Sequence, residues 1–272
     1  MKIYVQTDIE GVAGFCFFEN RNNPNYDNIL HRQRMYKLLT GEVNAAVKAA
    51  FDAGADEVYV NDNHGSGYNI IFEELDERCH IIHGRNGSCN VWLPKLDSSI
   101  DAMVMVGMHA MGGTPRSITP HSRWDVNDGE MYLSECTMAC ALAGEMGVPA
   151  VMVSGDDKIC AEVRKKIPGI VAVEVKEALS AYQACSLIPK RAQELIYEGV
   201  KKGIEQRNSI APFVIPGPVR LNLLDSKGHV PPLMPMGETV VADKISTAFD
   251  EYESRMPWNA GDVPLPDGFL FP

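Results

Sequence analysis

Cysteine pairs are missing from this sequence. Its seven cysteines stand singly, and no two of them form a C-x-x-C motif. Thiolate metal sites and redox-active dithiols commonly use that spacing, so the sequence offers a motif for neither. An odd number of scattered cysteines also argues against a disulfide framework, and a reducing compartment is the simpler interpretation. We therefore expect a cytoplasmic protein.

Positive charge is scarce as well. The chain has 25 Lys and Arg residues against 36 Asp and Glu residues, which gives a formal net charge of -11. Such a balance opposes loose binding to nucleic acids and to anionic lipid surfaces. Asp8 interrupts the first apolar run before it reaches the length of a signal-peptide core or a membrane span. We expect small neutral or cationic partners, and neither nucleic acid nor membrane.

What the sequence does contain is a regular alternation of strand-like and helix-like segments. Short apolar runs typical of buried parallel strands alternate with longer segments whose apolar residues recur at helical spacing. The predicted strands are 2–7, 57–60, 102–108 and 150–153, and the predicted helices are 29–53, 135–146, 155–167 and 189–205. This order predicts an α/β fold with a mostly parallel sheet covered by helices.

The character of the sequence changes near residue 209. Proline becomes frequent, an amphipathic segment follows at 242–252, and the tail from residue 256 is too rich in Pro and Gly for regular structure. We predict an α/β metal-binding catalytic domain at 1–208 and a smaller C-terminal α+β unit at 209–272. Because no long low-complexity linker separates the two, the smaller unit is expected to pack on the larger one.

Residues with metal-binding side chains follow three of the predicted strands. They are Asp8 and Glu10 after the first strand, His64 after the second, and His109 after the apolar run 102–108. Each has a simpler interpretation: acids after a strand can cap a helix, and a histidine can be a turn residue or a buried residue bonded to backbone. Open α/β sheets nevertheless bind ligands at the carboxyl ends of their strands, where all four fall. We predict that they meet, with Asp8 and Glu10 pointing the same way from extended backbone.

The chemistry of this set is that of a metal site. Carboxylates and imidazoles without thiolates suit zinc or a similar divalent ion, and a carboxylate shared by two ions is typical of two-metal hydrolases. His121, in a loop rich in Gly, Pro and Ser, is either a general acid–base or an exposed turn residue. The adjacent Ser122 lacks a G-x-S-x-G motif, which disfavours a serine nucleophile. Glu135 begins a predicted helix, where the helix dipole alone would account for a carboxylate.

At these positions the sequence resembles the bacterial D-aminopeptidases, a family of zinc metallopeptidases. The motifs that carry the resemblance are D-I-E-G at 8–11, V-N-D-N-H at 60–64, G-M-H-A at 107–110, P-H-S at 120–122, S-E at 134–135 and V-P-A-V-M-V-S-G-D-D at 148–157. They occur in order along most of the chain. The loop at 124–131 is expected to line the substrate pocket.

The resemblance implies a role for each candidate residue. Asp8 would bridge two zinc ions, Glu10, His64, His109 and Glu135 would complete the coordination, and His121 would be catalytic. The implied activity is that of a metal-dependent aminopeptidase that hydrolyses short peptides, with D-amino-acid residues among them, by a two-metal activated water. The resemblance further implies a homodecamer built from rings.

Two other functions would use the same ligands. One is a two-metal amidase or phosphoester hydrolase; a phosphoesterase would place Arg or Lys beside the metals to receive phosphate charge, and Arg116 and Arg123 are the nearby candidates. The other is a peptide-binding or assembly protein in which the metals only brace the fold. Assays with amide and phosphate ester substrates separate these possibilities.

Overall fold

A seven-stranded sheet forms the centre of the molecule. The computed structural model describes residues 1–17, 26–65, 67–84, 92–225 and 233–255. The strands of this sheet are β1 (Lys2–Thr7), β2 (Glu57–Asp62), β3 (His80–Ile82), β4 (Ala102–Met108), β7 (Ala150–Asp156), β8 (Val171–Ser180) and β9 (Gln183–Ser186), in the spatial order β3-β2-β1-β4-β7-β8-β9. All neighbours are parallel except β8 and β9. The order reverses at β1 and β4, so the sheet has a topological switch point there.

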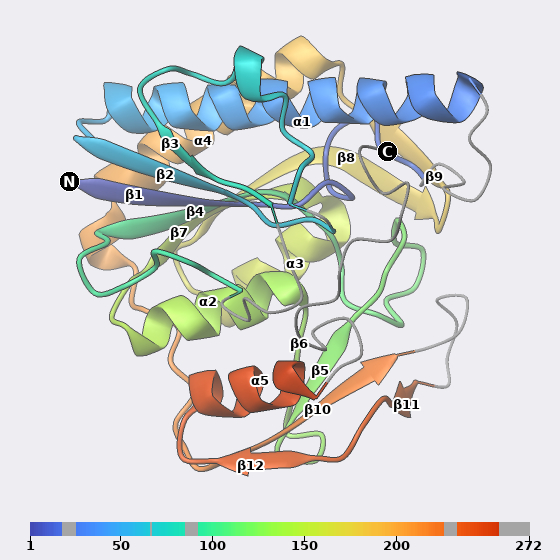
Figure 1. Ribbon diagram of the computed structural model, residues 1–272, viewed down its shortest axis with the longest axis vertical. Coiled ribbons are helices and arrows are strands. Elements are labelled where there is room, and N and C mark those ends of the chain that lie inside the picture. The colour runs from blue at the N-terminus through green and yellow to red at the C-terminus, as the bar shows by residue number, and fades with distance from the viewer. Residues whose placement is uncertain (18–25, 66, 85–91, 226–232, 256–272) are drawn as a thin grey trace.

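Helices cover both faces of this sheet (Figure 1). On one face lie α1 (Tyr26–Asp52) and α4 (Pro189–Glu205), and on the other lie α2 (Glu135–Glu145) and α3 (Asp157–Lys166). Two short 3-10 turns, η1 (Phe72–Glu74) and η2 (Arg207–Ser209), complete this part. Because it has helices on both sides, β4 is buried along its whole length, which explains its unbroken apolar sequence.

A smaller antiparallel sheet packs beyond α2. Its strands are β5 (Arg123–Val126), β6 (Met131–Leu133), β10 (Val219–Asp225), β11 (Met234–Pro235) and β12 (Val240–Ala242). The helix α5 (Ile245–Ser254) lies between this sheet and α2 (Figure 1). Its Phe249 and Tyr252 contact the ring of Trp124 on β5, which forms an aromatic core between helix and sheet.

The predicted fold class is confirmed: a mostly parallel, helix-covered sheet is combined with a smaller α+β part. The smaller sheet takes β5 and β6 from within residues 1–208 and pairs β5 with β10. The division of the chain at residue 208 remains a prediction, and any such division must accommodate this shared sheet.

The segment 124–131 does not form the loop that the sequence predicts, because β5 lies at its start and Trp124 is buried there against α5. The predicted irregular tail from residue 256 lies outside the described residues. Among the helices that the structure describes, none combines the length and apolar character needed to cross a membrane.

Candidate metal centre

Six side chains with metal-ligating atoms meet near the carboxyl ends of β1, β2 and β4. They form two groups, Asp8 with Glu10 and His64, and His109 with His121 and Glu135. Within each group, one ligand atom from every residue lies within 4.8 Å of the others. The structure thus brings together all six residues that the sequence nominated, while their individual roles remain predictions.

The first group is almost completely buried. Glu10 Oε1 lies 3.3 Å from His64 Nε2, and the Glu10 side chain is 1% exposed. Asp8 and Glu10 do not project from extended backbone as predicted, because the chain turns directly after β1. The turn brings the two carboxylates together instead.

Glycine makes this turn possible. The Gly11 N–H donates to Gly107 O at 2.7 Å, so the turn after β1 sits against the end of β4. A Cβ atom on Gly11 would lie 2.0 Å from Met108 O, and one on Gly107 would lie 2.2 Å from Asp8 O. Gly107 also has a positive φ of 77°. Backbones can approach this closely only where neither residue has a side chain.

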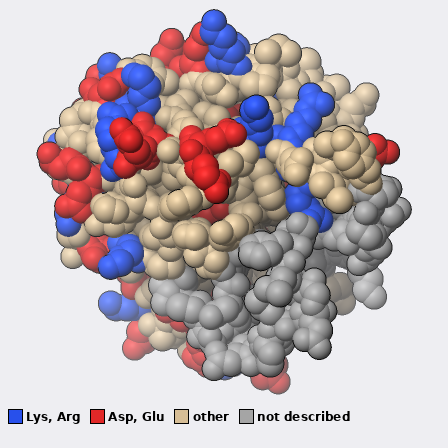
Figure 2. Space-filling view, turned by 45° about the horizontal axis from the view of Figure 1, so that its top comes forward, with Lys and Arg blue, Asp and Glu red and all other residues tan. Residues whose placement is uncertain are grey.

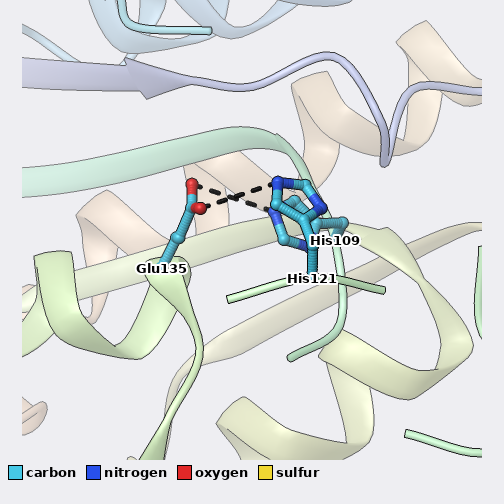
Figure 3. A group of neighbouring side chains, drawn as sticks. All are labelled: His109, His121 and Glu135. Atoms are coloured by element: carbon cyan, nitrogen blue, oxygen red, sulfur yellow. Dashed lines mark ion pairs between the residues drawn. The ribbon is translucent and has the colours of Figure 1, made fainter. Parts of the chain in front are cut away.

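The second group faces the first across a short gap. His109 Nε2 lies 3.4 Å from Asp8 Oδ2 and 3.8 Å from Glu135 Oε2, so His109 contacts both groups. His121 Nε2 lies 3.6 Å from Glu135 Oε1 and 3.8 Å from Glu10 Oε1. Figure 3 shows Glu135 at the start of α2 facing the two imidazole rings, which stack with centroids 4.0 Å apart.

A hairpin connects two of these residues. His121 precedes β5 by two positions and Glu135 follows β6 by two positions, so the antiparallel pairing of β5 with β6 brings their ends together. Glu135 is also fixed by the N-terminal cap of α2, where Ser134 forms a capping box with Thr137. The half-buried carboxylate of Glu162 accepts hydrogen bonds from both hydroxyls, at 3.0 Å and 2.8 Å.

Backbone carbonyls fix the orientation of two imidazoles. His109 Nδ1 lies 2.8 Å from Ala110 O, and His121 Nδ1 lies 2.9 Å from Thr119 O. Because a carbonyl oxygen only accepts, Nδ1 carries a proton in each ring, so the lone pair of the neutral imidazole is on Nε2, which faces the site. This arrangement is typical of histidines that bind a metal or a proton through Nε2.

His64 is oriented by a side-chain relay. Asn69 Nδ2 donates to Asp62 Oδ1 at 2.7 Å and to His64 O at 2.6 Å. These two bonds identify the other Asn69 atom, 3.2 Å from His64 Nδ1, as the carbonyl oxygen. His64 Nδ1 therefore carries the proton, and Nε2 again faces the carboxylates. The Asp62 carboxylate is in turn held by the backbone N–H groups of Asn69 and Ile70.

The charges of the site stabilise one another. Burial acts to lower the pKa of His64, but the carboxylate of Glu10 outweighs it and raises that pKa to about 9. Burial acts to raise the pKa of Glu135, but a hydrogen bond from His109 and the attraction of the His121 and His109 imidazoles outweigh it and lower that pKa to about 2. His121 differs, because burial and His109 both lower its pKa. It is therefore the imidazole most favoured in its neutral form.

Three buried atoms of the site lack a hydrogen-bond partner within the described residues. They are Asp8 Oδ2, Glu10 Oε2 and His109 Nε2. Unsatisfied polar atoms are costly in a protein interior, and charged ones most of all. A divalent ion would accept a lone pair from each, and carboxylate and imidazole are ligands that zinc-like ions prefer. The residues present therefore fit a metal centre.

Sequence reasoning missed the groups that hold the ligands in place. Asp62 and Asn69 surround His64 in sequence, and the run of polar residues there was their only signal. Glu162 lies on α3, far along the chain from the two hydroxyls that it contacts. No motif in the sequence marks it.

A parallel sheet that gathers two carboxylate and imidazole groups at its switch point is the architecture of a metal-dependent hydrolase. The family model described as D-aminopeptidase matches residues 1–256. The chain therefore belongs to the D-aminopeptidase family, and the predictions of family, of enzyme class and of an aminopeptidase function are confirmed.

Two proteins illustrate the likeness. A D-aminopeptidase of Bacillus subtilis (strain 168) is 28% identical over 224 residues, which cover 79% of this chain and 78% of the relative. The solved structure of Zn-dependent D-aminopeptidase DppA from Bacillus subtilis, a self-compartmentalizing protease, superposes with a TM-score of 0.80. It is 24% identical, and the match covers 94% of this chain and 99% of that one. This second likeness supports the fold.

Proposed function

We propose that this protein is a zinc-dependent aminopeptidase that removes N-terminal residues from short peptides, including peptides with D-amino acids. The observation that carries the proposal is the convergence of three carboxylates and three imidazole Nε2 atoms at one end of the sheet. Membership of the D-aminopeptidase family supports the peptide substrate. The zinc dependence of DppA supports the choice of metal.

Five residues would hold two ions. Glu10 and His64 would bind one, His109 and Glu135 the other, and Asp8 would bridge them. The position of Asp8 supports this role, because one of its oxygens lies 3.4 Å from His109 while it shares the first group with Glu10. Two divalent ions in such a site polarise a peptide carbonyl and lower the pKa of water.

His121 would transfer the protons of the reaction. Its side chain is 30% exposed, whereas that of His109 is 1% exposed, so His121 is the imidazole that a substrate can reach. Thr119 O holds its Nδ1 proton, which leaves Nε2 to take and return a proton. His121 also lies within ligand distance of Glu135, so a metal content that falls in His121→Ala would assign it to coordination instead.

Amide hydrolysis fits better than phosphoester hydrolysis. The guanidinium of Arg123, one of the two candidates for phosphate binding, lies over the ring of Tyr132 at 5.1 Å from its centroid. That position stabilises the β5–β6 hairpin by a cation–π contact. A phosphate ester turned over as fast as a dipeptide would overturn the preference for peptides.

We also propose self-assembly in the cytoplasm, as a homodecamer. Apolar side chains are exposed on or next to β11 and β12; they are Met234, Met236 and Val241. Exposed apolar side chains of this size favour burial against another subunit. The self-compartmentalizing DppA supports an enclosed assembly. Sedimentation at micromolar concentration should give a mass far above the 29.9 kDa of one chain, and a monomer would contradict the proposal.

Neither nucleic acid nor a membrane is part of the proposed function. On the face of the molecule shown in Figure 2, basic side chains are scattered among acidic ones over the described residues. The net charge of -11 also opposes binding to nucleic acids and anionic lipids. Binding to vesicles of anionic lipid or to RNA at physiological salt would contradict this part of the proposal.

One experiment tests the reaction. Metal-free protein is reloaded with zinc and assayed with pairs of L,L- and D,D-dipeptides, with their N-acetylated forms, and with a phosphate ester. We expect turnover of free dipeptides, with D-configured ones included, and none of the acetylated forms, because an aminopeptidase requires the free amine. Equal cleavage of acetylated and free dipeptides would show an amidase of another kind.

A further inference from the structure

We infer that Lys176 is a positioning residue for the metal-binding turn, and that its ammonium group holds the backbone that carries Asp8 and Glu10. Lys176 lies on β8, and 3% of it is exposed. Nothing in the proposed reaction uses its charge. The inference rests on the proposed metal site, and it adds a residue that none of the sequence motifs contains.

The ammonium group fills a cage of backbone carbonyls. Lys176 Nζ donates hydrogen bonds to Glu10 O, to Val12 O at 3.0 Å and to Phe15 O at 2.9 Å. An ammonium has three donors, and here all three are used. The three acceptors belong to a single stretch, residues 10–15, which begins at a proposed ligand.

A local irregularity of the sheet turns Lys176 inward. The register between β7 and β8 shifts between Gly155 and Asp156, so that Val175 and Lys176 are both buried although they are neighbours in a strand. Strict alternation would have placed one of them in solvent. Bulges of this kind often redirect a side chain near an active site.

The same turn is held from two other sides. Ala13 N–H donates to Glu42 Oε1 on α1 at 2.9 Å, and Gly11 N–H donates to Gly107 O at 2.7 Å. Those two bonds satisfy N–H groups of the turn, whereas Lys176 satisfies its carbonyls. Replacing Lys176 with an apolar residue would remove one donor from each of the three carbonyls, and the turn would have to reorganise to compensate.

A positioning role and a purely electrostatic role of Lys176 predict opposite changes in metal affinity when Lys176 is replaced. A positive charge near the site repels divalent ions, so if charge alone mattered, removing Lys176 would tighten metal binding. If Lys176 instead positions the turn, removing it weakens metal binding because Glu10 and Asp8 lose their fixed placement. Outer partners of metal ligands typically contribute about 10-fold to 100-fold in affinity.

The test compares Lys176→Met, Lys176→Arg and Lys166→Met with the wild type. Met keeps the unbranched side chain up to the position of Cε without its donors, and Arg keeps the charge, but its planar fork cannot direct donors at three converging carbonyls. Lys166→Met is the matched control for exchange in the turn, because Lys166 Nζ donates to one backbone carbonyl, Tyr132 O on β6 at 2.7 Å, and residues 9–15 should keep the wild-type exchange rate in this variant. Zinc affinity is measured by competition with a chelator, and amide hydrogen exchange is followed by mass spectrometry in the metal-free proteins.

We expect Lys176→Met to bind zinc about 10-fold to 100-fold more weakly. Peptides covering residues 9–15 should exchange faster, while those of β4 stay protected. The zinc affinity and the exchange rate of Lys176→Arg should lie between those of Lys176→Met and the wild type. If Lys176→Met does not fold, Lys176→Arg is the variant that tests the inference. Unchanged or tighter zinc binding together with unchanged exchange in the turn would overturn the inference. If the wild type bound no zinc, the proposed metal site would fail, and the exchange data alone would still decide whether Lys176 holds the turn.

Discussion

Asn69 offers a sharp test of how the site is built, because it contacts a proposed ligand without being one. Its side chain accepts the Nδ1 proton of His64 and donates to Asp62 Oδ1 and to His64 O. Asn69→Ala removes all three bonds at once. The backbone N–H of residue 69 still reaches Asp62, so the local turn keeps part of its support.

Two separate effects of Asn69→Ala follow from these contacts. Losing a partner of the buried Asp62 carboxylate should cost roughly 1–3 kcal/mol in the free energy of unfolding. Freeing the His64 ring should weaken zinc binding about 10-fold to 100-fold, which corresponds to about 1.4–2.7 kcal/mol. The first effect appears in metal-free protein, and the second appears only on binding.

The assay combines calorimetry of the metal-free protein with zinc titration against a competing chelator. Asn44→Ala is the matched control: Asn44 donates to Glu74 O at 2.7 Å and accepts from Asp76 N–H at 2.8 Å, but it contacts no histidine. We expect both variants to lose stability and only Asn69→Ala to lose zinc affinity. Equal zinc affinities in the two variants would refute the claim that Asn69 orients His64.

Four further predictions concern the site and its turn. Asp8→Asn should lower the zinc content and abolish turnover with the fold retained, and full zinc content with normal activity would remove its bridging role. His121→Ala should keep its zinc and lose roughly 10²-fold to 10⁴-fold in kcat for a dipeptide; a change in KM alone would make it a substrate-positioning residue. Gly11→Ala should lower the unfolding free energy by about 1–3 kcal/mol, since its Cβ would lie 2.0 Å from Met108 O; an unchanged melting temperature would show that the turn can relax. Burial raises the pKa of Glu42 to about 7 from 4.5, so the folded state holds this proton where the unfolded state releases it, and the contribution of Glu42 to stability falls as pH rises from 4.5 to 7. The melting temperature of Glu42→Gln relative to wild type should therefore rise between pH 5 and pH 7.5, and a constant difference would argue against a buried neutral Glu42.

The parts of the site that the sequence could predict are those that follow strand ends. Asp8 and His109 directly follow apolar runs, and His64 lies in the polar run after the next strand. Because the carboxyl ends of parallel strands share one edge of the sheet, their meeting follows from local pattern alone. Glu135 was assigned only through resemblance, because a carboxylate at a helix start has a purely local explanation. Its neighbour His121 is brought to it by the β5–β6 hairpin.

Long-range pairing and register could not be read from the sequence. β5 has four residues, and its partner β10 lies far along the chain. The local pattern of apolar residues therefore does not show that the two strands belong to the same sheet. Lys176 sits in an alternating strand where a charged residue is typical of the solvent face. Its burial depends on a shift of register against β7, which is a property of two strands together.

The shared smaller sheet also bears on the order in which the metal centre is assembled during synthesis. The ribosome completes β1 to β7 first, so Asp8, His64 and His109 emerge before Lys176 on β8 can hold the turn after β1. β5 lacks its partner on one edge until β10 has emerged, and the hairpin that joins His121 to Glu135 stays half supported until then. A nascent chain therefore carries the residues that follow β1, β2 and β4 before the hairpin that joins His121 to Glu135 has all its strand partners.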